Sequence, residues 1–128
     1  MGSKEPIAIS EAESLIMEVI WRLKMATCED IISALGSESK WRQGTVKALL
    51  NRLLKKGAVA ASKEGRRYSY RPVLQRERWL KTETKSFMDR LFEGRLAPLV
   101  AHFSAERKLS KKDIAELKRV ISEMEGDE

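Results

Sequence analysis

The sequence predicts a mostly α-helical protein with one small β-hairpin. Three observations support this fold class: apolar residues recur at helical spacing along most of the chain, one short stretch has the alternating pattern of strands, and a proline follows that stretch. We place a domain boundary at this proline, which gives an N-terminal domain at residues 9–72 and a helical domain at residues 73–128. Residues 1–8 are expected to be a tag or a disordered N-terminus.

Two capping signatures predict where the first two helices begin. Ser10 is followed three residues later by a glutamate, and apolar residues then recur on one helical face as far as Leu23. Thr27, followed three residues later by an aspartate, is the N-cap of a second, shorter helix that Gly36 ends. The polar residues 37–40 predict a turn between this helix and the next.

The third helix has the strongest periodicity in the chain. It begins after residues 37–40, ends at Gly57, and its apolar residues follow i, i+3, i+4, i+7, i+8 spacing. These residues are Val46, Leu49, Leu50, Leu53 and Leu54. Trp41, just before this helix, is expected to pack against the core rather than to stack on a nucleic-acid base.

A β-hairpin with a basic tip follows Gly57. Residues 59–63 and 67–71 have strand character, and Glu64-Gly65-Arg66 is a turn signal between them. Pro72 ends the hairpin because proline cannot donate to a β-ladder.

The remainder of the chain predicts three helices. They cover about residues 75–92 before Gly94, a shorter segment after Arg95, and a segment capped by Ser110. Their apolar side chains exceed what three isolated helices can bury, which favours dimerisation over a self-contained three-helix core. The residues concerned are Leu80, Phe87, Leu91, Leu99, Phe103, Ile114, Leu117 and Ile121.

Positive charge is concentrated in residues 40–71. Ten lysines and arginines lie there against one acidic residue, whereas the chain as a whole has a net charge of +6. The element order is that of a winged helix-turn-helix, in which the third helix enters the major groove of double-stranded DNA and the hairpin, or wing, contacts the backbone. The predicted DNA-binding residues are Arg42, Gln43, Thr45, Lys47, Arg52, Lys63, Arg66 and Arg67.

We assign these side chains two roles. Gln43 and Thr45 have groups that can read base edges, and they lie near the start of the third helix. Lys47, Arg52, Arg66 and Arg67, in contrast, are expected to contact mainly phosphates. Two other uses of a winged helix stay open: a protein-docking module, and a regulator that responds to a small molecule.

Enzymatic chemistry has little support in this sequence. With one histidine, one cysteine and no phosphate-binding glycine motif, we expect no catalytic residues, no metal site and no cofactor. Cys28 is expected to be structural or incidental. The chain has no signal peptide and no apolar run long enough to cross a membrane, so we expect it in the cytoplasm.

A family resemblance covers nearly the whole chain after the first few residues. It is carried by Ile9-Ser10-Glu11-Ala12-Glu13, Trp21, Trp41, residues 45–53, Lys55-Lys56-Gly57, Glu64-Gly65-Arg66, residues 68–72, residues 83–87, residues 89–92 and Leu109-Ser110. In these motifs the chain resembles the BlaI/MecI/CopY family of penicillinase repressors. The resemblance implies a homodimer whose C-terminal helices interlock about a twofold axis, bound to a palindromic operator and released by an inducing signal.

The chain departs from the family pattern in three places. Residues 42–45 read Arg-Gln-Gly-Thr where members commonly have Ser-Pro-Lys-Thr, so we expect a different preferred operator. For the antibiotic-resistance members, the resemblance implies induction by cleavage of an Asn-Phe bond in the dimerisation region. His102-Phe103 occupies the matching place in this chain. Cleavage of this bond would require a membrane sensor-protease as a partner. Whether the bond is cleaved stays open. The C-terminal Cys-x-Cys pair of copper-responsive members is absent, which argues against copper sensing.

Overall fold

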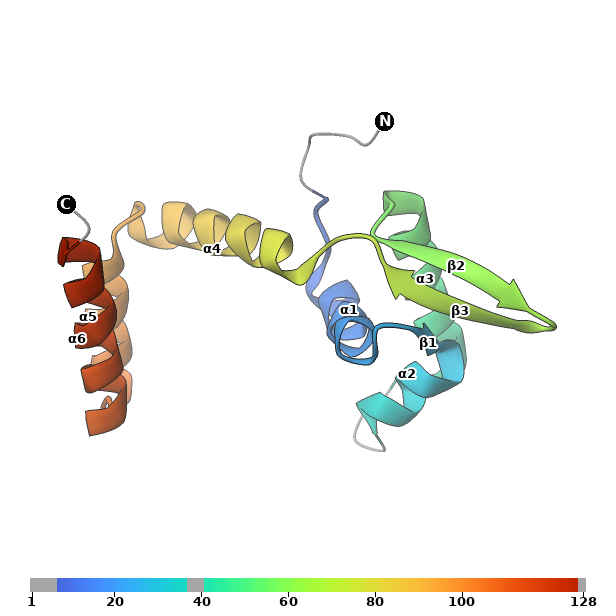
Figure 1. Cartoon of the computed structure of the whole chain (residues 1–128), viewed down its shortest axis with the longest axis horizontal. Coiled ribbons are helices and arrows are strands. Elements are labelled where there is room, and N and C mark those ends of the chain that lie inside the picture. The colour runs from blue at the N-terminus through green and yellow to red at the C-terminus, as the bar shows by residue number, and fades with distance from the viewer. Residues whose placement is uncertain (1–6, 37–40, 127–128) are drawn as a thin grey trace. The chain divides into compact units, whose positions relative to one another are not determined.

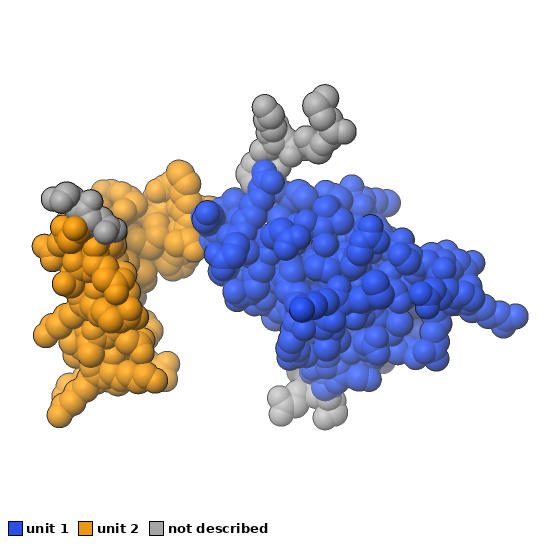
Figure 2. Space-filling view, in the orientation of Figure 1, with its two compact units in different colours: residues 1–83 blue, residues 84–128 orange. Residues whose placement is uncertain are grey.

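A computed structural model describes residues 7–36 and 41–126 of the chain (Figure 1). The turn predicted at residues 37–40 lies outside the described residues. The elements are α1 (Glu11–Leu23), β1 (Ala26–Thr27), α2 (Cys28–Leu35), α3 (Gln43–Lys56), β2 (Val59–Glu64), β3 (Arg67–Pro72), α4 (Arg76–Phe92), α5 (Leu96–Glu106) and α6 (Lys111–Gly126). The chain forms two compact units, and the boundary between them lies within α4, between Glu83 and Thr84 (Figure 2). The predicted fold class, mostly helical with a small hairpin, is confirmed.

The N-terminal caps predicted for α1 and α2 are present. The Ser10 hydroxyl accepts from the backbone N–H of Glu13 at 3.1 Å, and the Glu13 carboxylate accepts from the backbone N–H of Ser10. Thr27 and Asp30 form the same reciprocal box at the start of α2. Since each box satisfies two backbone N–H groups that a helix start leaves unpaired, it fixes the residue at which the helix begins.

The sheet has three strands, one more than the hairpin that the sequence predicted. Its order is β1-β3-β2, and all neighbours are antiparallel. The extra strand pairs Ala26 with Tyr70 and Thr27 with Ser69. A strand of two residues has no periodicity to detect, so sequence patterns could not predict it. Its consequence is that the start of α2 lies beside the hairpin.

The core of the N-terminal unit lies between α1, α2, α3 and the sheet. Ile16, Ile20, Ile31 and Leu50 are completely buried in it. Trp41 packs against this core, as predicted. The described chain begins at Ile7, two residues before the predicted start of the first domain. Its side chain packs against the same core, because an apolar residue next to a core is stabilised by burial.

The first turns of α4 also belong to the N-terminal unit. The Trp21 and Trp79 rings lie 5.3 Å apart, and Trp21 Nε1 donates to the Leu74 carbonyl at 2.8 Å. Arg76 adds an ion pair to Glu18 of α1. The domain boundary that the sequence placed at Pro72 stays a prediction, but these contacts tie residues beyond it to α1.

The C-terminal unit comprises the end of α4, α5 and α6, and none of these helices contains a buried residue. The predicted ends are present: Gly94, at φ +75°, lies just after α4, and the Ser110 hydroxyl accepts from the backbone N–H of Asp113 at the start of α6. No helix within the described ranges is long and apolar enough to cross a membrane.

Glu13 is the one buried charged residue among those described, and it forms an ion pair with Lys56 at the end of α3. Burial by itself would raise the pKa of this carboxyl. The hydrogen bond from Lys56, the hydrogen bonds from Ser10 and the charge of Lys56 outweigh burial, so the net pKa is lowered from its ordinary value of 4.5. The pair therefore stabilises the fold above pH 4.5, and this contribution is lost as the pH falls through the lowered pKa.

Replacing Glu13 with glutamine should lower the free energy of unfolding at pH 7 by about 1–3 kcal/mol, the cost of a charged hydrogen bond. It should also flatten the dependence of stability on pH in the acid range. Urea unfolding followed by tryptophan fluorescence at several pH values tests both effects. Glu11→Gln removes an exposed carboxylate two residues away and should change stability by less than about 0.5 kcal/mol. Equal pH dependence in the parent and Glu13→Gln would contradict the assignment.

Candidate nucleic-acid interface

Helix α3 presents one polar face to solvent because its apolar face is used by the core. Val46, Leu49, Leu50 and Leu53 are buried against the rest of the N-terminal unit. This packing fixes the rotation of the helix and leaves the opposite face exposed. The predicted DNA-binding residues of α3, Gln43, Thr45, Lys47 and Arg52, are all exposed, and so is Arg42 at its N-cap.

The wing is a tight hairpin with a positive tip. Glu64 pairs with Arg67 in the β2–β3 ladder, so Gly65 and Arg66 alone form the turn. Gly65 has φ +64°, a conformation that glycine adopts without strain. Lys63 lies over the Tyr68 ring at 5.6 Å, which holds its charge beside the hairpin. Arg66 and Arg67 are exposed at the tip.

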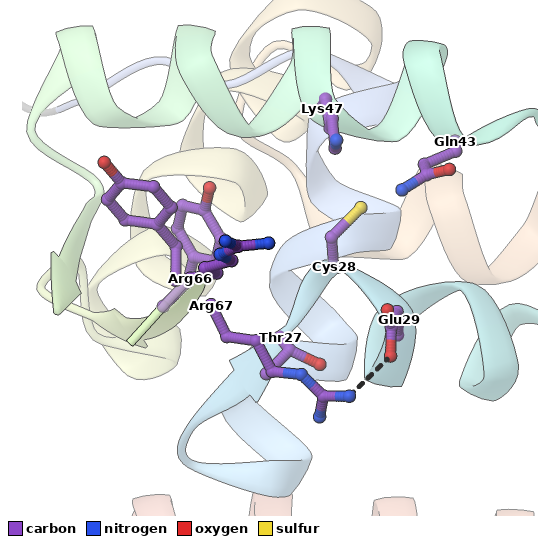
Figure 3. Close-up of a pocket in the computed structure, with 9 residues that line it drawn as sticks. Thr27, Cys28, Glu29, Gln43, Lys47, Arg66 and Arg67 are labelled. Carbon is purple, nitrogen blue, oxygen red and sulfur yellow. Dashed lines mark ion pairs between the residues drawn. The ribbon is translucent and has the colours of Figure 1, made fainter. Parts of the chain in front are cut away.

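Three elements meet around a hollow of about 150 Å³ that we call the basic pocket. Figure 3 shows Gln43 and Lys47 reaching from α3 toward the thiol of Cys28, while Arg66 and Arg67 come from the wing. The residues that line the pocket are Thr27, Cys28, Glu29, Gln43, Lys47, Arg66, Arg67, Tyr68 and Tyr70. A concave surface with three cations from two separate elements is suited to hold a phosphodiester backbone.

The basic pocket unites four of the eight residues predicted to bind DNA. Gln43, Lys47, Arg66 and Arg67 line it. The other four, Arg42, Thr45, Arg52 and Lys63, are exposed on α3, its N-cap and β2, but they do not line this pocket. Their role in binding stays a prediction.

Sequence reasoning missed the contribution of the α2 start. Thr27, Cys28 and Glu29 reach the pocket because β1 pairs with β3 and sets this turn next to the wing. The capping signature at Thr27 located the helix start, but only the pairing of β1 shows which surface it faces. Tyr68 and Tyr70 were recognised as strand residues and not as pocket residues.

The pocket keeps its positive charge at neutral pH. Burial raises the pKa of the Cys28 thiol, although the nearby charge of Lys47 opposes this effect. Burial also raises the pKa of Tyr70, and Cys28 and Tyr68 add to the shift. Because both groups then stay neutral, the ionised side chains lining the pocket are Lys47, Arg66, Arg67 and Glu29. Within the described residues, no group of three or more His, Cys, Asp or Glu could hold a metal ion.

The C-terminal unit carries an apolar surface of a different kind. Phe87, Leu91, Phe103, Ile114 and Ile121, all predicted dimer contacts, are 39% to 56% exposed. The other three, Leu80, Leu99 and Leu117, are half-buried, and Leu80 belongs to the N-terminal unit. A hollow of about 480 Å³ is lined by Phe103, Leu109, Leu117 and Val120 together with Asp113, Glu116 and Arg119.

His102 and Phe103 lie inside α5, and both are exposed. A protease binds its substrate in an extended form, so cleavage of this bond would require local unwinding of the helix. Cleavage at this position stays a prediction.

Comparison with known proteins identifies relatives over nearly the full chain. The family model described as penicillinase repressor matches residues 9–123. The penicillinase repressor of Bacillus licheniformis is 34% identical over 115 residues, which cover 90% of each chain. The methicillin resistance regulatory protein MecI of Staphylococcus aureus is 28% identical over 114 residues, covering 89% of this chain and 93% of MecI.

Among solved structures, one that resembles part of the chain does so at a similar level of identity. It is the solution structure of the DNA-binding domain of the repressor BlaI, with a TM-score of 0.52 and 36% identity. The match covers 59% of this chain and 93% of that domain. The fold is therefore that of a winged helix.

Proposed function

Because the chain belongs to the penicillinase repressor family, we propose that it is a homodimeric transcriptional repressor that binds a palindromic operator in double-stranded DNA. In this proposal α3 enters the major groove, where Gln43 and Thr45 read base edges. Lys47, Arg52, Arg66 and Arg67 hold the phosphates on either side of the groove. An inducing signal releases the dimer from DNA.

The basic pocket is the observation that carries the DNA part of this proposal. It brings Gln43 and the cations Lys47, Arg66 and Arg67 to one pocket, so that one duplex can meet a base-reading group and phosphate-binding groups together. The name of the BlaI domain, which is a DNA-binding domain, supports the same use of the fold.

The dimer part rests on the apolar surface of the C-terminal unit. Three helices with no buried residue leave large apolar side chains in water, which is costly unless another surface covers them. A second copy of the chain can cover this surface. A palindromic site also calls for two copies, since a twofold axis relates its two identical half-sites. Two winged helices then reach grooves about 34 to 36 Å apart, or a multiple of that distance.

Selection of duplexes from a random-sequence library by the full chain tests the proposal. We expect enrichment of a twofold-symmetric sequence, with binding that weakens steeply as salt rises because phosphate contacts release counterions. The single cysteine supplies a second measurement. Because the Cys28 thiol lines the basic pocket, the selected duplex should slow its reaction with a maleimide, and a salt concentration that dissociates the complex should restore the rate.

Two results would contradict the proposal. Absence of any enriched sequence, together with binding that does not respond to salt, would remove the repressor function. Tight binding of a selected duplex with an unchanged rate of Cys28 modification would place the DNA on another surface.

A further inference from the structure

The basic pocket contains one carboxylate in the midst of its cations. Among the described residues that line it, Glu29 is the single acidic side chain, and it faces Arg67 across the pocket (Figure 3). A negative charge on a surface that should attract phosphate opposes that function, because like charges repel. Its presence there needs a physical reason.

The ion pair between these residues is loose. Arg67 Nη2 and Glu29 Oε2 are 3.7 Å apart, and the two side chains are 72% and 68% exposed. This separation is longer than a hydrogen bond, and exposed pairs of this kind are weak because water and salt screen them. A phosphate oxygen approaching Arg67 can therefore replace the carboxylate.

The capping box of α2 does not use the Glu29 side chain, although this carboxylate lies in the first turn of the helix, where a negative charge is favourable. The neighbouring acid, Asp30, performs the capping function: its Oδ2 accepts from the backbone N–H of Thr27 at 3.0 Å, and this hydrogen bond lowers the pKa of Asp30. The Asp30 carboxylate therefore bonds the backbone of Thr27 and feels Arg67 only through its charge, whereas the Glu29 carboxylate forms the ion pair with the wing.

We propose that Glu29 competes with DNA for Arg67: it pairs with the arginine in the free protein, and a backbone phosphate displaces it when the duplex binds. This inference rests on the proposed DNA binding. The competition lowers affinity for every duplex, because Arg67 is a phosphate contact that carries no sequence information. Glu29 thereby weakens binding to operator and non-operator DNA by the same factor, while base reading by Gln43 is unaffected.

Glu29→Gln tests this proposal in the full chain, with the selected duplex and a scrambled duplex of equal length as probes. We expect the affinity for both duplexes to rise by roughly threefold to tenfold at low salt. The slope of log K against log salt should steepen by up to about 0.9, the value for one more neutralised phosphate. The ratio of the two affinities should stay the same.

Two control variants isolate the pair from the general charge. Glu77→Gln removes the same charge from an exposed site in the first turn of α4 and should change affinity much less. In an Arg67→Gln background, Glu29→Gln should lose most of its effect, because the residue for which it competes is absent.

Each remaining result overturns the proposal. If Glu29→Gln leaves affinity and salt slope unchanged, Glu29 does not compete for Arg67. If it weakens binding, the carboxylate positions Arg67 for DNA instead. If its effect is equally large with Arg67→Gln, the pair is irrelevant. Failure of the parent chain to bind any duplex would instead reject the proposed function itself.

Discussion

Replacing Phe87 with glutamate should convert the protein to a folded monomer that binds its selected duplex on the order of a hundredfold more weakly. Phe87 is 39% exposed on α4, and Leu91 lies one turn further along the same face of this helix, which we call its apolar stripe. A carboxylate introduced there would be buried against the second copy, where no partner compensates its lost hydration. Dimerisation would fail for that reason.

The loss of affinity follows from the geometry of a palindromic site. In a dimer, binding of one winged helix holds the second close to its half-site at a high effective concentration, typically in the millimolar range for short linkers. A monomer binds each half-site independently and loses this advantage. Sedimentation velocity measures the oligomeric state, and fluorescence anisotropy of a labelled duplex measures the affinity.

Ser86→Glu is the matched control for Phe87→Glu. It adds the same charge to the adjacent, exposed position of α4, off the apolar stripe, and should leave both the dimer and the affinity nearly unchanged. The unfolding transition of the N-terminal unit, reported by the packed rings of Trp21 and Trp79, should be the same in both variants. A Phe87→Glu chain that stays dimeric, or a monomer with full affinity, would reject this interface.

Removing both wing-tip arginines should weaken binding to every duplex by roughly tenfold or more, without changing the preferred sequence. Arg66 and Arg67 line the basic pocket and are exposed, so they can reach phosphates. In the variant with Arg66→Gln and Arg67→Gln, the slope of log K against log salt should fall by roughly 1 to 2, because each phosphate contact contributes about 0.9.

Gln43→Ala should change the choice of sequence rather than the affinity for every duplex. The amide can make two hydrogen bonds to an adenine edge, so its removal should change discrimination between operators by about 1–3 kcal/mol and leave the salt slope unchanged. For the variant without the two arginines, the charge control is Lys55→Gln, which removes a cation from the end of α3, outside the basic pocket. Loss of sequence choice in the arginine variant, or a uniform loss in Gln43→Ala, would reverse the two roles.

The order of helices and the wing could be predicted because their signals are local. The capping pairs at Ser10 and Thr27 and the glycine at position 57 each act within a few residues, and the structure places the ends of α1, α2 and α3 at these positions. The apolar periodicity of α3 likewise fixes which face is buried, and therefore which side chains stay exposed.

The basic pocket was only half predictable. Charge density singled out Lys47, Arg66 and Arg67, since a basic run is visible in the chain itself. The approach of Glu29 to Arg67 has no local signal, because the two residues belong to different elements and meet only when β1 pairs with β3.

By itself, the sequence therefore determined the secondary structure, the concentration of positive charge and the apolar stripes of the C-terminal helices. Only the tertiary structure decided that the α2 start completes the pocket, and that the first turns of α4 pack on α1 through Trp21 and Trp79. The physical reason is the range of the interactions. Caps and periodicity depend on neighbours in the chain, whereas strand pairing and ring packing depend on which surfaces can be buried together.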